Sequence, residues 1–231
     1  MSLPVIAITV GDPAGIGPEI ARKAAASKQV LACCRPVIYG PWGDDSLSAF
    51  AQGRPSAEGG QAAYEAIATA VGDALEKKVD AIATGPLSKE GLAMAGHPWK
   101  GHTDLLAHLT GASRVAMMFW SPRLRVVLAT VHIPLADVPA ALTAERLRDA
   151  VELSQLEMPR FGVPAPRIAV AALNPHAGER GLIGHEEETV MRPAIDALRG
   201  QGIDVTGPFP ADTLFVRAAR GEFDVIIAAY H

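Results

Sequence analysis

The stretch "DVIIAAYH", Asp224–His231, closes the sequence and indicates how the chain folds. Val225–Ala229 is a short, almost wholly apolar run that follows a charged segment. A strand buried on both faces of a parallel sheet has this pattern, because neither of its faces meets water. Such strands lie in the interior of a fold, whereas chain ends are normally exposed. We therefore expect His231 at the end of a core strand, where its role needs an explanation.

Short apolar runs alternate with amphipathic helical stretches along the rest of the sequence. Further strands are predicted over 5–10, 37–39, 80–84, 115–120, 125–131, 167–173 and 203–205. Helices are predicted after GDPAGIG with Pro18 in the first turn, over 64–75, from Ser88, from an N-cap at Thr103, from Thr143 to Met158, over 186–198 and over 213–220. This alternation predicts an α/β fold with a mostly parallel sheet and helices on both faces. The short separation of strands 115–120 and 125–131 predicts one antiparallel hairpin.

The composition limits the class of protein. The chain has 231 residues, a net charge of −4 and 49% hydrophobic residues. This charge gives no basis for binding nucleic acid or a membrane surface, so the expected partner is a small molecule. The sequence has no apolar run long enough to span a membrane and no signal-peptide pattern, which predicts a cytoplasmic location. Cys33 and Cys34 are adjacent and are expected to be reduced.

Three of the seven histidines follow predicted strands. They are His132 in VVLATVH, His176 in IAVAALNPH and His231 in DVIIAAYH. Groups beyond the carboxyl ends of strands line the crevice where open α/β sheets bind ligands. Three imidazoles leave one position open on a divalent metal, which is the arrangement of a catalytic metal site. The alternative is that each ring only bonds to a nearby backbone carbonyl.

Two glycine-containing motifs are candidates for binding an anion. GDPAGIGPE, Gly11–Glu19, leads into a helix N-terminus, but it matches no standard nucleotide fingerprint and is explained equally well as a tight connection. GHTD, Gly101–Asp104, places His102 and Thr103 at the predicted start of a helix, where they are candidates to contact a phosphate or carboxylate. Lys89, after TGPLS, is either an anion contact or a solvated side chain.

Two further loops carry polar groups after strands. NPHAGERG, Asn174–Gly181, combines His176 with Glu179 and Arg180, which are either functional or an exposed ion pair. In GPFPADTLF, Asp212 is expected to be an N-cap, with a contact to a metal-bound histidine as the alternative. His97, His108 and His185 are expected to be solvated or satisfied locally.

The ordered set of motifs resembles a known enzyme family. The stretches GDPAGIGPE, TGPLSK, GHTD, VHIPL, NPHAGE, GPFPADTLF and AAYH are similar, in this order, to signature stretches of the 4-hydroxythreonine-4-phosphate dehydrogenase (PdxA) family of vitamin B6 biosynthesis. The resemblance runs from residue 4 to residue 231. Seven motifs in order are much more specific than any one of them.

The resemblance implies a fold and a set of site residues. The fold is the two-lobed α/β architecture of isocitrate and isopropylmalate dehydrogenases, with residues 1–112 in the first lobe and 113–231 in the second. It further implies a homodimer with active sites at the subunit interface. The metal ligands, which are also the catalytic residues, fall on His132, His176 and His231, and the substrate contacts on His102 and Thr103. The metal is zinc, with magnesium and cobalt as the other candidates, and the cofactor is NAD or NADP.

The implied reaction is oxidation of the secondary alcohol of 4-phosphohydroxy-L-threonine, followed by loss of CO₂. VIYGPW and the short stretch between Tyr39 and Gly59 are instead similar to terephthalate dihydrodiol dehydrogenases of the same superfamily. Those relatives lack intact GHT and HIPL motifs, which this sequence keeps. A phosphorylated hydroxy acid is therefore the favoured substrate, while a four-carbon sugar-acid phosphate and a diol stay open.

In the family, the last motif continues into a long segment that carries much of the NAD site and part of the phosphate site. The resemblance therefore implies that the C-terminal part, which would complete the first lobe, is missing here, and it assigns no NAD-binding residues. Two other classes of function stay open from the residues alone. One is a zinc hydrolase with Glu179 as general base, and the other is a non-catalytic binding protein.

Overall fold

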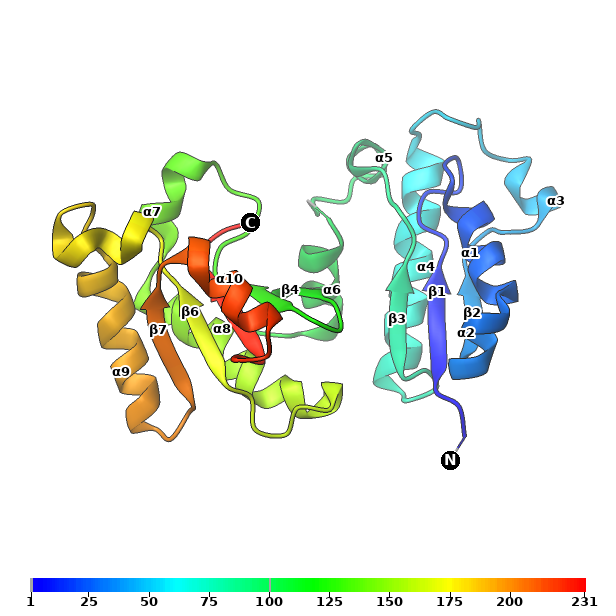
Figure 1. Ribbon diagram of the computed structural model, residues 1–231. Helices are drawn as coiled ribbons and strands as arrows, with labels where there is room; N and C mark the ends of the chain where they lie inside the picture. The colour runs from blue at the N-terminus through cyan, green and yellow to red at the C-terminus, as the bar shows by residue number, and fades with distance from the viewer. Residues whose placement is uncertain (1, 100) are drawn as a thin grey trace. The chain divides into compact units, whose positions relative to one another are not determined.

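A computed structural model describes residues 2–99 and 101–231 of the chain (Figure 1). The chain divides into two compact units, Met1–Ser113 and Arg114–His231. Within the described ranges, no helix is both long and apolar enough to cross a membrane.

The first unit is built on a parallel sheet with the strand order β2–β1–β3. Its elements in chain order are β1 (Val5–Thr9), α1 (Gly17–Ala26), α2 (Lys28–Cys33), β2 (Arg35–Tyr39), α3 (Asp44–Leu47), α4 (Ala57–Leu75), β3 (Ala81–Thr84), α5 (Lys89–Met94) and α6 (His102–Thr110). Ala7 of β1 packs with Ala70 of α4, and the next residue, Ile8, packs with Ala21 of α1. Successive side chains of a strand point to opposite faces, so α4 and α1 cover the two faces of this sheet.

The second unit is built on a mixed sheet with the strand order β4–β5–β8–β6–β7. Its elements in chain order are β4 (Met117–Trp120), β5 (Arg125–Leu128), η1 (Leu135–Asp137), α7 (Val138–Ala141), α8 (Ala144–Glu157), η2 (Met158–Phe161), β6 (Ile168–Ala171), η3 (Pro175–Gly181), η4 (Glu187–Met191), α9 (Arg192–Gly200), β7 (Val205–Phe209), α10 (Ala211–Ala219) and β8 (Val225–Ala228). Only the β4–β5 pair is antiparallel among the strand pairs of the described residues, which confirms the predicted hairpin.

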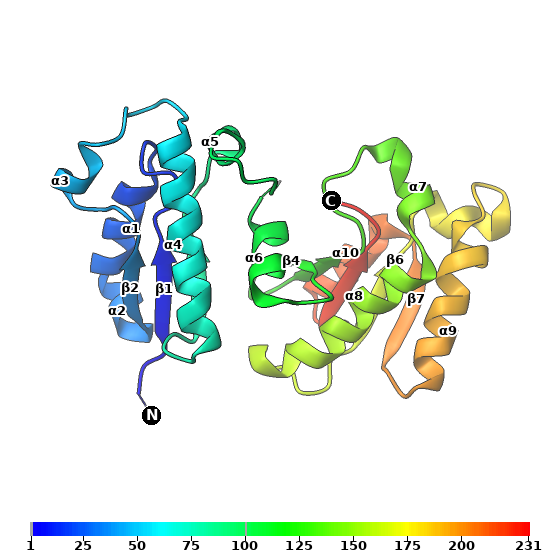
Figure 2. The same ribbon diagram turned by 180° about the vertical axis from the view of Figure 1, so that it is seen from behind.

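The last strand, β8, lies in the middle of the second sheet. It pairs in parallel with β5 on one side and with β6 on the other. Ile227 packs among residues of α8 and α9, whereas Ile226 packs against Leu214 of α10. Figure 1 shows α10 in front of this sheet, and Figure 2, the view from behind, shows α8 on the opposite face. Because both faces of β8 are covered, the strand needs apolar side chains at every position, as predicted.

An ion pair fixes the starts of β6 and β8 side by side. The Arg167 guanidinium donates to both carboxylate oxygens of Asp224, from Nε at 2.9 Å and from Nη2 at 3.0 Å. The backbone N–H of Arg167 donates to the same carboxylate at 2.9 Å. These hydrogen bonds favour the charged form, so they lower the pKa of Asp224.

Three of the predicted local features differ from the structure. Helix α6 begins at His102 and its N-cap is Gly101, so Thr103 lies in the first turn and caps nothing. Helix α10 begins at Ala211 after Pro210, so Asp212 is not the N-cap either, and its Oδ1 accepts from the N–H of Thr213 at 2.9 Å. Strand β7 lies later than predicted, over Val205–Phe209. It is an edge strand, where a proline such as Pro208 is tolerated.

Candidate metal and substrate site

His132 and His231 come together beyond the ends of two neighbouring strands. The hydrogen-bond ladder between β5 and β8 continues past the strands, with Ala129 N–H donating to the Ala228 carbonyl at 2.9 Å and Thr130 N–H to the Ala229 carbonyl at 3.1 Å. Thr130 Oγ1 also donates to the Ala229 carbonyl at 2.7 Å. This pairing fixes the register between the segments that follow β5 and β8. The rings of His132 and His231 consequently lie 5.9 Å apart between centroids, with their planes tilted by 38°.

The two rings line one pocket of about 210 Å³. Its other walls are Thr130, Ile133, Leu135, Val138 and Tyr230. The edge of the Phe119 ring from β4 also faces His231, at 5.4 Å between centroids. His132 has a φ of 54°, in the left-handed region that non-glycine residues rarely adopt. Such backbone strain is concentrated at functional sites, where the surrounding structure holds it in place.

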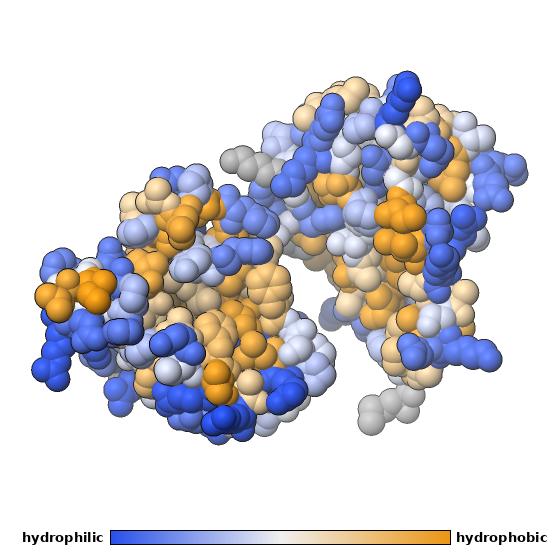
Figure 3. Space-filling view, turned by 45° about the horizontal axis from the view of Figure 1, so that its top comes forward, coloured by the Kyte–Doolittle hydropathy of each residue, from blue (hydrophilic) through white to orange (hydrophobic). Residues whose placement is uncertain are grey.

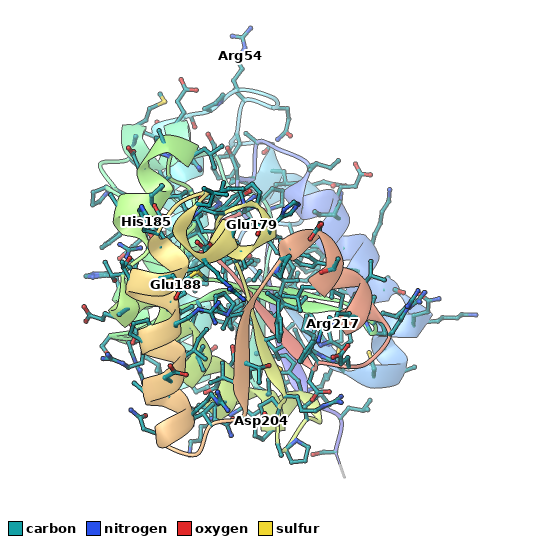
Figure 4. The ribbon with its side chains drawn as sticks, turned by 60° about the vertical axis from the view of Figure 1, so that its left-hand side comes forward. Arg54, Glu179, His185, Glu188, Asp204 and Arg217 are labelled. Carbon is teal, nitrogen blue, oxygen red and sulfur yellow. The ribbon has the colours of Figure 1, made fainter. Side chains whose placement is uncertain are left out.

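The third predicted ligand, His176, lies in a different pocket. This pocket has a volume of about 570 Å³ and is lined by residues that follow β6 and β8 and by the start of α10, among them Asn174, Asp212 and Tyr230. His176 Nδ1 donates to Glu179 Oε1 at 2.9 Å, so the neutral ring keeps its Nε2 lone pair free. Figure 4 shows Glu179 in the loop that follows β6. Among the residues that the structure describes, no three histidine, cysteine, aspartate or glutamate side chains gather closely enough to hold a metal ion.

Two of the three predicted ligands fit a divalent metal. Two imidazoles on one tetrahedral zinc ion have ring centroids about 5 Å apart, given a zinc–nitrogen distance of about 2 Å. The pair of His132 and His231 is close to this separation. His176 has the carboxylate partner that commonly orients a metal-bound histidine. The three imidazoles are ligand types that suit zinc. The structure brings His132 and His231 together, whereas His176 lies in the neighbouring pocket.

The parallel strands of the second unit end on the side that Figure 3 turns forward. On this side of the second unit, apolar residues occupy the centre and hydrophilic residues the outer rim (Figure 3). A centre of this kind, with a few polar groups converging on it, is typical of a small-molecule site.

In the first unit, His102 is held partly buried at the start of α6. Burial lowers the pKa of the His102 imidazole, and a hydrogen bond to the Gly85 backbone opposes this shift. Its Nε2 is buried and has no hydrogen-bond partner within the described part of the chain. A buried polar atom without a partner costs about 1–3 kcal/mol. A hydrogen bond from a ligand to this nitrogen would remove that cost.

The stability of the protein is expected to depend on the protonation of His102. Its pKa is lower in the folded chain than the ordinary value of 6.5, so the unfolded chain binds more protons in this range. Stability should be fully present above pH 6.5 and should fall as the pH drops below it. In His102→Asn this loss should be smaller, as measured by urea denaturation at pH 7 and pH 5.5. His108→Asn, at an exposed position, is the matched control. An identical pH dependence in His102→Asn and the wild type would contradict this expectation.

The GDPAGIG motif forms a tight connection between β1 and α1. A Cβ on Gly11 would lie 2.1 Å from the Pro86 carbonyl oxygen, and one on Gly17 would lie 1.7 Å from the Val10 carbonyl oxygen. Asp12 Oδ1 accepts from the N–H of Ala14 at 2.9 Å. Close backbone packing therefore explains why Gly11 and Gly17 are glycines, without a role in binding an anion.

The remaining candidates have local explanations. Lys89 is exposed at the start of α5, and Ser88 before it is the N-cap, accepting from Gly91 N–H at 3.0 Å. His97 Nε2 donates to Gln61 Oε1 at 2.9 Å, and the His97 ring stacks on Tyr64. His108 and His185 are exposed. Glu187 is fully buried beside Asn174 and was not predicted, because the run HEEE has the composition of a solvated loop.

Comparisons with known proteins agree with these features. The sequence model of the PdxA family, the pyridoxal phosphate biosynthetic protein PdxA, matches residues 18–231. The chain is 41% identical to D-threonate 4-phosphate dehydrogenase of Cupriavidus necator, over 99% of this chain and 80% of that protein. It is 40% identical to 4-hydroxythreonine-4-phosphate dehydrogenase of Geobacter metallireducens, over 99% of this chain and 78% of that protein.

A solved structure also superposes closely. The crystal structure of 4-hydroxythreonine-4-phosphate dehydrogenase from Klebsiella pneumoniae matches with a TM-score of 0.92 and 36% identity, over 99% of this chain and 80% of that chain. This confirms the fold class expected from the sequence. The chain belongs to the PdxA family of pyridoxal phosphate biosynthetic proteins.

Proposed function

We propose that this chain is a zinc-dependent, NAD-linked dehydrogenase that oxidises the secondary alcohol of 4-phosphohydroxy-L-threonine. The observation that carries the proposal is the pairing of His132 and His231 beyond the ends of β5 and β8, in a chain of the PdxA family. Oxidation moves a hydride from the alcohol carbon to the nicotinamide and releases the hydroxyl proton. The product is a β-keto acid, which then loses CO₂.

His132, His231 and His176 are the proposed metal ligands. A divalent cation bound there supplies the Lewis acidity that favours loss of the substrate hydroxyl proton. The three imidazoles have to be neutral to bind it. The hydrogen bond from His176 Nδ1 to Glu179 presents Nε2 as the binding atom.

His102 and Thr103 are the proposed contacts to the substrate. The free Nε2 of His102 supports this role, because it is a buried ring nitrogen with no partner in the described chain. In its neutral form this nitrogen accepts a hydrogen bond, and once a proton is bound it donates one to a phosphate. The residues that bind NAD are not assigned.

D-Threonate 4-phosphate is the second candidate substrate. It is favoured by the 41% identity to the Cupriavidus necator enzyme that is named for it. Both molecules carry a carboxylate, a secondary alcohol and a terminal phosphate, and they differ in having an amino or a hydroxyl group at C2. The metal, the nicotinamide and the phosphate contact are the same for both candidates.

The test is a direct assay of NADH formation at 340 nm. Protein loaded with zinc receives NAD or NADP and, in separate reactions, 4-phosphohydroxy-L-threonine, D-threonate 4-phosphate or a terephthalate-type dihydrodiol. We expect the highest kcat/KM with 4-phosphohydroxy-L-threonine, and loss of the signal after chelation of the metal. Absence of NADH with every substrate would contradict the proposal, and turnover without nicotinamide would support a hydrolase instead.

We further propose that the protein acts as a homodimer. Exposed aromatic side chains support this, because Phe119 and Trp120 of β4 are each about half exposed and Phe119 faces His231. Large exposed aromatic residues are enriched at protein interfaces. Sedimentation at several concentrations tests the proposal. The cytoplasmic location stays a prediction.

A further inference from the structure

The loop that carries His176 adopts an unusual backbone conformation. Five consecutive residues, His176–Arg180, have positive φ angles between 46° and 76°. They form a left-handed turn, in which only Gly178 is a glycine. The left-handed conformation is unfavourable for each non-glycine residue, because its Cβ lies too close to the following carbonyl oxygen. Contacts outside the turn therefore have to hold it in place.

The buried carboxylate of Glu187 provides such contacts. Glu187 is 0% exposed. Its Oε1 accepts from the backbone N–H of Asn174 at 2.7 Å, and its Oε2 accepts from Asn174 Nδ2 at 2.9 Å. The same Asn174 amide donates to Glu186 Oε2 at 2.7 Å. Carboxylates therefore fix both the backbone and the side chain of Asn174, the residue that opens the loop. These carboxylates belong to Glu187 of η4 and to Glu186, which directly precedes η4.

The turn itself packs directly on this network. A Cβ on Gly178 would lie 2.7 Å from Glu187 Oε2, and a Cβ on Gly184 would lie 2.2 Å from Asn174 Nδ2. The backbone at both glycines therefore approaches the carboxylate and the amide too closely for any side chain. Residues 174–187 form one interlocked unit, with His176 and Arg180 on its exposed side.

We propose that Glu187 is a positioning residue, which holds the left-handed turn and thereby fixes the orientation of His176. The assignment of His176 as a metal ligand rests on the proposed function, whereas the support of the turn by Glu187 does not. The charge of the side chain matters, because both carboxylate oxygens accept hydrogen bonds from Asn174. In Glu187→Gln, one of these acceptors becomes an NH₂ group that faces another donor.

The turn can be tested in metal-free protein, because Arg180, its last residue, is an exposed site for trypsin. We expect Glu187→Gln to raise the rate of cleavage after Arg180 at least tenfold, as the cleavage rate follows the fraction of open loop. Glu188→Gln is the matched control. Glu188 is the next residue, is exposed and pairs with Arg192 at 2.9 Å, so its substitution should leave the cleavage rate unchanged. Figure 4 shows Glu188 and Glu179 on neighbouring segments of this region.

The effect on His176 is tested by zinc binding, measured with a competing chelator. We expect Glu187→Gln to weaken zinc affinity about 10–100-fold, the usual effect of losing a group that orients a ligand, and Glu188→Gln to leave it unchanged. If Glu187→Gln does not fold, Gly178→Ala disturbs the same contact from the other side and should produce both effects.

The cleavage and zinc-binding experiments together distinguish a failure of this inference from a failure of the proposed function. Unchanged cleavage after Arg180 in Glu187→Gln would overturn the role of Glu187 in holding the turn. Faster cleavage with unchanged zinc affinity would overturn its effect on His176. If the wild type binds no zinc, the metal site in the proposed function is wrong, and the cleavage arm alone decides the role of Glu187.

Discussion

Replacing His132 by alanine is expected to lower kcat/KM at least about a hundredfold and to reduce the zinc content of the purified protein. The two effects share one cause, because the substitution removes one of the two imidazoles that meet in the pocket beyond β5 and β8. Loss of a group that only orients a metal ligand costs about 10–100-fold, and loss of the ligand itself should cost more. Steady-state kinetics and metal analysis by atomic absorption measure the two effects.

His185→Ala is the matched control for this substitution. His185 is exposed and lies outside both pockets that contain the candidate ligands. We expect its activity and zinc content to equal those of the wild type. If His132→Ala retained full zinc content and activity, the assignment of the metal to these histidines would be wrong. If it retained zinc but lost activity, His132 would instead act on the substrate.

The sequence predicted the sheet better than the ends of the helices. The apolar run of β8 can only be buried on both faces, so its central place follows from its composition. Thr143 was correctly predicted as an N-cap, accepting from Arg146 N–H at 3.2 Å. The same reasoning was wrong at Thr103, because the backbone is already helical one residue earlier. A capping residue type indicates that a helix starts nearby, but the local backbone decides which residue is the cap.

The site was only partly predictable for a related reason. Position after a strand indicated three histidines, and the pairing of parallel strands β5 and β8 brings two of them together. The third follows β6 through a left-handed turn, which no sequence pattern predicts because most of its residues are not glycine. Glu187 was missed since a buried carboxylate and a solvated one look alike in a run such as HEEE. Its burial depends on Asn174, thirteen residues earlier in the chain.

A large effect on stability is expected at Gly60 of α4. A Cβ there would lie 2.0 Å from the Gly91 carbonyl oxygen of α5, and backbone atoms cannot move aside as a flexible side chain can. We expect Gly60→Ala to lower the free energy of unfolding by about 3 kcal/mol, the upper end of the usual cost of overpacking. Urea denaturation followed by circular dichroism measures this change.

Gly72, in the same helix, is the matched control for Gly60. Apart from the adjacent residues and the nearby backbone of α4 itself, no heavy atom of the described residues lies within 4 Å of a Cβ built at Gly72. Gly72→Ala should therefore stabilise the protein by about 0.4–1 kcal/mol, because alanine restricts the unfolded chain and favours the helix. Opposite signs for one substitution in one helix would show that the contact between α4 and α5, rather than helix propensity, requires glycine at position 60. Equal effects at both positions would contradict this close approach. The contact matters for the site as well, because the loop leading into α5 begins at Gly85, which bonds to His102.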